Sequence, residues 1–139
     1  MAIIIDLKNA IRKAIYQRDN TINFFFNEIL KVQYPYVFFY IPSFKVEKAI
    51  NSEYWRKVNL MCVIEYALKE NNSSSDLWQY ADVLNEVYAL FEFEDTKLRA
   101  RNTEFKIVDG VLQMTFDLEF YVKAEDETEL MQLLALQLK

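Results

Sequence analysis

Residues 105–122, FKIVDGVLQMTFDLEFYV, alternate apolar and polar side chains on both sides of Asp109–Gly110, which contains the chain's single glycine. Asp-Gly is a favoured pair in two-residue turns whose twist matches that of the flanking strands. A turn at these two residues brings the apolar side chains of both arms to one side. The pairs that result are Val108–Val111, Ile107–Leu112 and Phe105–Met114. The sequence therefore predicts an antiparallel hairpin with one register.

The second arm of this hairpin divides its side chains between two faces. The apolar face carries Leu112, Met114, Phe116, Leu118, Phe120 and Val122. The polar face carries Gln113, Thr115, Asp117 and Glu119. A shift of one residue would bury both carboxylates, so the register is strongly specified. Asp117 and Glu119 could act as an acid pair or bind a cation, but alternating acids on a strand are more typical of a solvated face.

The chain lacks the residues on which most catalytic and metal sites depend. It has no histidine, one cysteine and one glycine. These counts exclude Ser-His-Asp and Cys-His arrangements, the usual structural zinc site, the P-loop and the dinucleotide fingerprint. The cysteine, Cys62, lies in the apolar stretch VNLMCVIEYAL and is interpreted as a buried small hydrophobic residue. We predict no cofactor, no metal and no catalytic site, and an enzyme is the least favoured class.

Length and composition favour a single soluble domain, residues 1–139. The chain is 53% hydrophobic, which excludes disorder, yet no apolar run approaches the roughly 20 residues needed to span a bilayer. No secretory leader is recognised, and we expect a cytosolic protein. Residues 1–70 carry ten Lys and Arg against seven Asp and Glu, and residues 71–139 carry six against fourteen, giving the net charge of −5. An acidic chain is an unlikely general partner for nucleic acid.

Apolar residues recur at helical spacing in residues 3–18 and again in residues 77–91. The positions concerned are Ile4, Leu7, Ile11 and Ile15 in the first segment, and Leu77, Ala81, Leu84, Val87 or Tyr88, and Phe91 in the second. The polar run ENNSSSD precedes the second segment and ends in a candidate serine cap. We predict an amphipathic helix in each segment.

Two further segments alternate as strands do. Residues 33–49 predict a strand with Pro42 at a bulge or an edge, because proline cannot donate to a central ladder. Residues 54–69 predict another strand, and residues 20–32 a short strand followed by an irregular stretch. One face of the strand in residues 54–69 carries Val58, Leu60, Cys62, Ile64, Tyr66 and Leu68, and the other Trp55, Lys57, Asn59, Met61 and Glu65.

The remaining segments are shorter or ambiguous. EFED, residues 92–95, and EDE, residues 125–127, are interpreted as solvated turns rather than metal loops. In residues 125–139 a capping-box pattern favours a short helix running into an extended end, and the leucines pack either on their own domain or on another subunit. The order of elements predicts an α+β fold, in which two main helices pack on one face of an antiparallel sheet.

YADVLNEVYALFE, residues 80–92, and KLRARNTEFKIVDGVLQMTFDLEFYV, residues 97–122, resemble the second half of small tail terminator proteins from tailed phages and prophages of Gram-positive bacteria. The shared features are the helix spacing, an arginine-containing segment and the residue order of the second hairpin arm. Met114 stands where the family pattern has an aromatic residue. The first helix and both long strands also lie where the family has such elements, so the resemblance covers nearly the whole chain.

The resemblance implies a structural role: a six-fold ring that caps the head-proximal end of the tail tube, stops tube polymerisation and offers a joining surface to the neck of the head. Its partners would be other copies, the tail tube protein and the head-neck connector protein. DNA would pass through the lumen without specific binding. The protein would occupy the virion tail after assembly and the bacterial host cytoplasm before it.

For the site residues, the resemblance suggests two groups. Arg99 and Arg101 are candidates for a charged contact with the adjacent subunit, with simple solvation as the alternative. The polar hairpin face, Gln113, Thr115, Asp117 and Glu119, is a candidate for a subunit interface or the ring lumen. Another phage neck or tail-tube ring protein is the closest rival function, and a small acidic cytosolic binding or immunity protein is a second.

Overall fold

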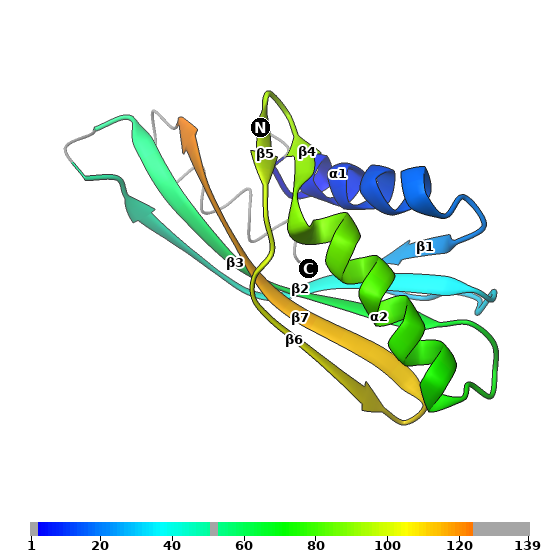
Figure 1. The fold of residues 1–139 in the computed structure, drawn as a ribbon. Helices are drawn as coiled ribbons and strands as arrows, with labels where there is room; N and C mark the ends of the chain where they lie inside the picture. Colours follow the sequence, from blue (N-terminus) through cyan, green and yellow to red (C-terminus); the bar gives the residue numbers. More distant parts are fainter. Residues whose placement is uncertain (1–2, 51–52, 124–139) are drawn as a thin grey trace.

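The computed structural model describes residues 3–50 and 53–123. The helices and strands are α1 (Ile3–Arg18), β1 (Asn23–Phe26), β2 (Tyr36–Lys48), β3 (Trp55–Ala67), α2 (Ser74–Ala89), β4 (Phe91–Phe93), β5 (Thr96–Leu98), β6 (Arg101–Val108) and β7 (Val111–Lys123). Five strands form one sheet in the order β1-β2-β3-β7-β6, and β4 pairs with β5 alone. Both helices lie on one face of the larger sheet, which confirms the predicted α+β fold (Figure 1).

The hairpin of β6 and β7 forms in the predicted register. Val108 is paired with Val111, and Phe105 with Met114. Asp109 and Gly110 have φ angles of 52° and 75°, the positive values that a mirror-type two-residue turn requires at both positions. Leu112, Met114, Phe116, Leu118 and Phe120 are buried, as predicted.

The sheet differs from the predicted antiparallel arrangement at one edge. β1 runs parallel to β2, with Asn23 opposite Tyr36 and Phe26 opposite Phe39. The chain between the two strands returns to the start of β2 through residues 27–35 instead of reversing in a tight hairpin, and this return is what makes a parallel pair possible. The remaining pairs of this sheet are antiparallel.

The central strands β3 and β7 have one bulge on each side, the first in β2 and the second in β6. In β2 the register shifts between Tyr40 and Ser43, so Pro42 lies at a bulge, as predicted. In β6 it shifts between Arg101 and Glu104. Bulges bend a strand and increase its twist. Beyond this level the ends of β2, β3 and β7 extend past the helices as a projecting arm (Figure 1).

Three predicted boundaries or faces need correction. Helix α2 ends at Ala89, and Phe91, which was assigned to its apolar face, begins β4 because Leu90 has an extended backbone. The segment after α2 forms the short hairpin of β4 and β5, which buries Phe93 and Leu98 on the core and which the sequence reading missed. Leu68 is 39% exposed because β3 ends one residue earlier.

Other local predictions are confirmed. The side chain of Ser73 caps α2 by accepting a hydrogen bond from the backbone N–H of Asp76 at 3.2 Å. EFED is only in part the predicted solvated turn: Glu94 and Asp95 form a turn, with a positive φ of 52° at Glu94, whereas Glu92 and the buried Phe93 belong to β4. Cys62 is buried, and burial raises the pKa of its thiol. Residues 125–139, with their predicted helix and leucines, lie outside the described residues.

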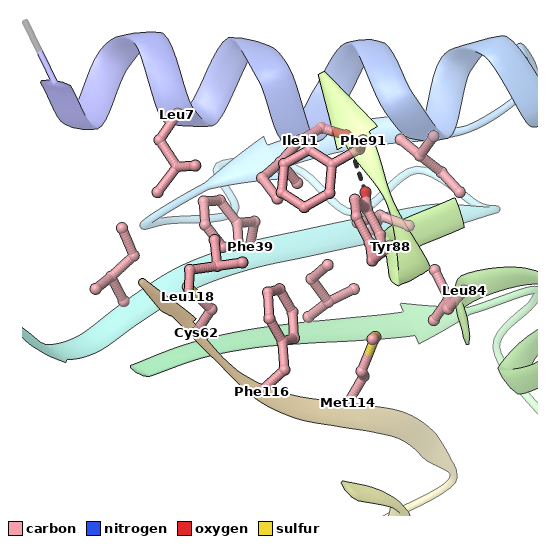
Figure 2. Packing of buried hydrophobic residues seen from close by; sticks show 14 of the residues in the cluster. Leu7, Ile11, Phe39, Cys62, Leu84, Tyr88, Phe91, Met114, Phe116 and Leu118 are labelled. Carbon is pink, nitrogen blue, oxygen red and sulfur yellow. Dashed lines mark hydrogen bonds between the residues drawn. The ribbon is translucent and has the colours of Figure 1, made fainter. Parts of the chain in front are cut away.

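Tyr88 of α2 lies at the centre of the core, where it joins three elements (Figure 2). Its ring stacks on that of Phe116 at 6.0 Å between centroids, and meets Phe91 edge-on at 5.4 Å. Its hydroxyl donates a hydrogen bond to the backbone carbonyl of Ile11 in α1 at 2.9 Å. The side chain is fully buried, so this hydrogen bond satisfies a hydroxyl that water cannot reach. Tyr88 therefore fixes α1 and α2 relative to each other and to β7.

Replacing Tyr88 by phenylalanine tests this arrangement. The change removes one buried hydrogen bond and leaves the ring in place, so the free energy of unfolding should fall by about 1 kcal/mol. Urea unfolding of the purified protein measures the difference. The matched control is Tyr121→Phe on β7, since Tyr121 is 55% exposed and its replacement should leave stability unchanged. Equal stabilities for both variants would contradict the role given to the Tyr88 hydroxyl.

Candidate interaction surface

The face of the five-stranded sheet opposite α1 and α2, here called the open face, carries the predicted site residues. Side chains alternate across a strand, and the register then aligns them from one strand to the next. Asp117 lies opposite Arg101 on one side and opposite Met61 on the other. Along β7 the same face continues through Thr115 and Gln113, which are half-buried. The hairpin's polar face is therefore part of a larger surface spanning all five strands.

A cluster of paired charges lies on this face at the level of the two bulges. The Glu119 carboxylate is 3.5 Å from Lys57 Nζ through Oε1 and 3.9 Å from Arg101 Nη1 through Oε2. Asn102 Nδ2 donates a hydrogen bond to Asp117 Oδ2 at 2.9 Å. Side-chain exposure is 27% for Glu119 and 32% for Lys57, so this pair is partly shielded from water. The β3–β7 and β6–β7 pairings assemble the cluster.

The structure thus brings together three of the six predicted residues, Arg101, Asp117 and Glu119. Arg99 is exposed in the link between β5 and β6. Two participants, Lys57 and Asn102, were missed by the sequence reading. Lys57 had already been placed on the polar face of its strand, but its partnership with Glu119 depends on the register between β3 and β7.

An open hollow of about 360 Å³ lies beside this cluster. It is lined by Ser43, Phe44, Lys45, Asn59, Leu60, Met61, Arg101, Asn102, Asp117 and Glu119. Charges of both signs line its wall, and the Met61 side chain is 40% exposed. Such a mixed, open hollow suits a side chain from another protein surface better than a small ligand, which is usually enclosed.

The other half of the open face is aromatic. Phe38 and Tyr40 on β2 have ring centroids 5.1 Å apart, and Phe25 on β1 meets Tyr36 edge-on at 6.3 Å. Tyr34, 43% exposed, continues the row with its ring 5.6 Å from that of Tyr36. The sequence reading treated this segment only as a strand, although an aromatic residue at every second position from 34 to 40 is a visible signal for an aromatic stripe.

Tyr36 and Tyr40 of this stripe keep their hydroxyls protonated at neutral pH. Burial raises the pKa of Tyr36 and of Tyr40, and the nearby negative charge of Glu65 raises both further. Gln113 Nε2 donates to the Tyr40 hydroxyl at 3.5 Å, which connects the aromatic half to the polar face of β7. The stripe therefore presents apolar rings with polar edges, a composition typical of protein–protein contacts.

The described residues hold neither a metal-binding cluster nor a membrane-spanning helix. Among residues 3–50 and 53–123, no group of three or more His, Cys, Asp or Glu side chains is placed to hold a metal ion. Of the described helices, none is long and apolar enough to cross a membrane.

Comparison with known proteins identifies the family. The model of a family described as phage tail terminator protein matches residues 6–129. The match runs from the first turn of α1 past the end of β7, and so covers both helices and every strand of the open face. The chain therefore belongs to the phage tail terminator family, whose members are structural components of the virion tail. No match was found among curated proteins.

Replacing Glu119 by glutamine tests the charge cluster. The variant keeps the side-chain shape but loses attraction to Lys57 and Arg101, so stability should fall by about 0.5 kcal/mol in low salt. Urea unfolding at low salt and in 1 M NaCl measures this, and the difference should shrink in high salt because ions screen exposed charges. The control is Glu70→Gln, since Glu70 is exposed in the turn after β3. A salt-independent loss would contradict an electrostatic origin.

Proposed function

We propose that this protein assembles as a six-fold ring on the head-proximal end of the tail tube, ends tube polymerisation there and offers the head-neck connector protein its joining surface. The observation that carries the proposal is the family match across residues 6–129. The open face supports it, because an aromatic stripe and a mixed-charge hollow on a sheet face that neither described helix covers are features of a surface that binds another protein.

The charge cluster affects how strongly the proposed ring would repel DNA that passes through it. The sequence left either a subunit interface or the ring lumen open for Asp117 and Glu119, and two unpaired carboxylates would make a lumen acidic, but Glu119 is paired with Lys57 and Arg101. The negative electrostatic field of these two carboxylates is therefore weaker than the sequence of the hairpin alone indicated. We propose that these residues lie at a boundary between subunits. The net charge of −5 still disfavours adhesion of passing DNA.

Assembly would begin from free protein in the host cytoplasm and end in the virion tail. Besides other copies of itself, the protein would contact the tail tube protein below and the connector above. Membership of the terminator family favours this role over a tube subunit, another neck ring protein or a small acidic immunity protein.

Deleting the gene in the encoding phage or prophage tests the termination role. Without a terminator, tube subunits continue to add, so electron microscopy should show tails of abnormal, uncontrolled length without heads. Complementation with the wild-type gene should restore tails of one length joined to heads. Head-joined tails of normal length in the deletion strain would contradict termination.

The open face can be tested without losing the fold. Lysine at both Asp117 and Glu119 places new cations beside Lys57 and Arg101, so a loss of assembly could not be told from a loss of stability. The double variant Lys57→Glu/Glu119→Lys instead reverses the closer ion pair while keeping its attraction, and only the longer 3.9 Å contact with Arg101 becomes unfavourable. Its thermal unfolding should stay within a few degrees of wild type, whereas the yield of head-joined virions should fall.

Two controls make this result interpretable. Arg18→Glu with Glu86→Arg reverses an ion pair on the helix side of the molecule, whose Nη2 and Oε2 lie 3.1 Å apart on more exposed side chains, and tests whether any charge reversal has the same effect. Glu119→Lys alone should be less stable than the double reversal. If the Lys57→Glu/Glu119→Lys variant is stable and gives a normal yield of virions, the charge cluster is not part of the assembly surface.

A further inference from the structure

The helix layer has two outer flanks that carry opposite charge. On α1, the residues that line the hollow of about 380 Å³ shared with α2 and β4 include Ala10, Ala14 and Gln17. At 3.6 residues per turn, Lys8 and Arg12 lie on the opposite side of the helix axis. The α1 flank, defined here as Lys8, Arg12 and Tyr16, therefore faces away from α2.

The α1 flank is positive and partly aromatic. Arg12 is exposed, and its guanidinium carbon lies 5.0 Å from the centroid of the Tyr16 ring. Lys8 is one turn away on the same side and half-buried. Within the described part of the chain, Arg12 forms no ion pair. The arrangement holds a cation over an aromatic ring with one side of the guanidinium open to solvent.

The second flank belongs to α2 and has the opposite sign. Trp78, Asp82 and Asn85 line an open hollow of about 450 Å³ together with Phe105 of β6. These α2 residues, defined here as the α2 flank, face away from α1. On the other side of α2, the Tyr80 hydroxyl donates to Oδ2 of Asp19, the residue that follows α1, at 3.1 Å. Trp78 is 45% exposed, and among residues 3–50 and 53–123 Asp82 has no cationic partner.

The two flanks lie on opposite sides of the molecule. Leu7 and Ile11 of α1 lie above Phe39 of β2, near one edge of the sheet (Figure 2). The α2 flank borders β6, which is the strand at the other edge. Figure 1 shows the same arrangement, with the helices side by side over the sheet. One copy can therefore present its α1 flank to the α2 flank of a second copy without either copy turning over.

We infer that the α1 flank of each copy binds the α2 flank of the next copy, an inference that rests on the proposed ring. In this contact Arg12 pairs with Asp82 of the neighbouring copy, beside that copy's Trp78. Both surfaces combine an aromatic ring with a charge, and the charges are opposite. Arginine can form a carboxylate pair and stack on an indole at the same time. A contact between two different patches of one chain is heterologous, and repetition of such a contact closes a ring when the rotation permits.

Charge reversal tests this pairing in the complemented deletion strain. Arg12→Asp and Asp82→Arg alone should each lower the yield of head-joined tails about tenfold, the effect of losing one contact of moderate strength. The double variant Arg12→Asp/Asp82→Arg should recover most of that yield. Lys69→Asp and Glu70→Arg make the same charge changes in the exposed turn after β3 and should have no effect. Circular dichroism of each purified variant checks folding.

Cysteine cross-linking gives a second readout that does not depend on charge. Native Cys62 is fully buried, so it contributes no cross-link while the protein is folded. In purified tails treated with a mild oxidant, the double variant Arg12→Cys/Asp82→Cys should give a ladder of linked copies. Arg12→Cys and Asp82→Cys alone should not, because one cysteine per copy cannot bridge two different flanks repeatedly.

The outcomes separate this inference from the proposed function. Recovery in the double charge reversal together with a ladder would support the pairing. Normal tails from both single reversals, with no ladder, would overturn it while the deletion phenotype still established termination. The inference would also be overturned if both single reversals lowered the yield of head-joined tails but the double reversal did not restore it and no cross-linked ladder formed. That result would assign the flanks to contacts with the tube or the connector.

Discussion

The uninterrupted pairing of β3 with β7 is the interaction on which the rest of the structure depends. The two strands stay in register from Trp55 opposite Lys123 to Tyr66 opposite Leu112. On one face every pair along the centre is apolar and buried, as with Cys62 and Phe116. A shift of one residue would turn Asp117 and Glu119 into that core and expose the apolar side chains. The free-energy cost of that exchange keeps the two strands in this register. Helices, bulges and charge cluster are all placed relative to this pair.

The neighbours of this pair explain how the open face is divided. β2 and β6 flank it, and their bulges lie at one level, since Ser43, Met61, Asp117 and Arg101 form one row across the sheet. Because the outer strands bend there while the central pair continues, the sheet changes direction and the arm projects beyond the helices (Figure 1). The mixed-charge hollow lies at the same level. Fold and candidate surface therefore have a common origin.

The features that the sequence predicted are local ones. The turn at Asp109–Gly110, the serine cap of α2 and the bulge at Pro42 each depend on residues a few positions apart, and each is found in the structure. The parallel β1 was not predicted, because its direction depends on how the chain returns to β2.

The partnerships within the candidate surface were equally out of reach. The pairing of Lys57 with Glu119 requires a register between strands far apart in the chain. The aromatic stripe of β2 alternates with Val37, Phe39 and Ile41, so apolar character alone did not show which face of this strand the helices cover. The β4–β5 hairpin was missed for a related reason. Its Phe91 continues the apolar helical spacing of α2, and only the extended Leu90 ends the helix before it.

The strength of the contacts bears on when a ring of this kind would form. An exposed ion pair, such as the proposed one between Arg12 of one copy and Asp82 of the next, stabilises a contact by at most about 1 kcal/mol. Stacking of the arginine on an aromatic ring adds a similar amount. A single contact of this strength leaves the protein dissociated in dilute solution. In the proposed ring on the end of a tail tube, however, bound copies would be held side by side, so each further contact would form at a high effective concentration. Weak and repeated heterologous contacts would therefore favour closure on the tube end over closure in solution, which is the order of events that a terminator requires.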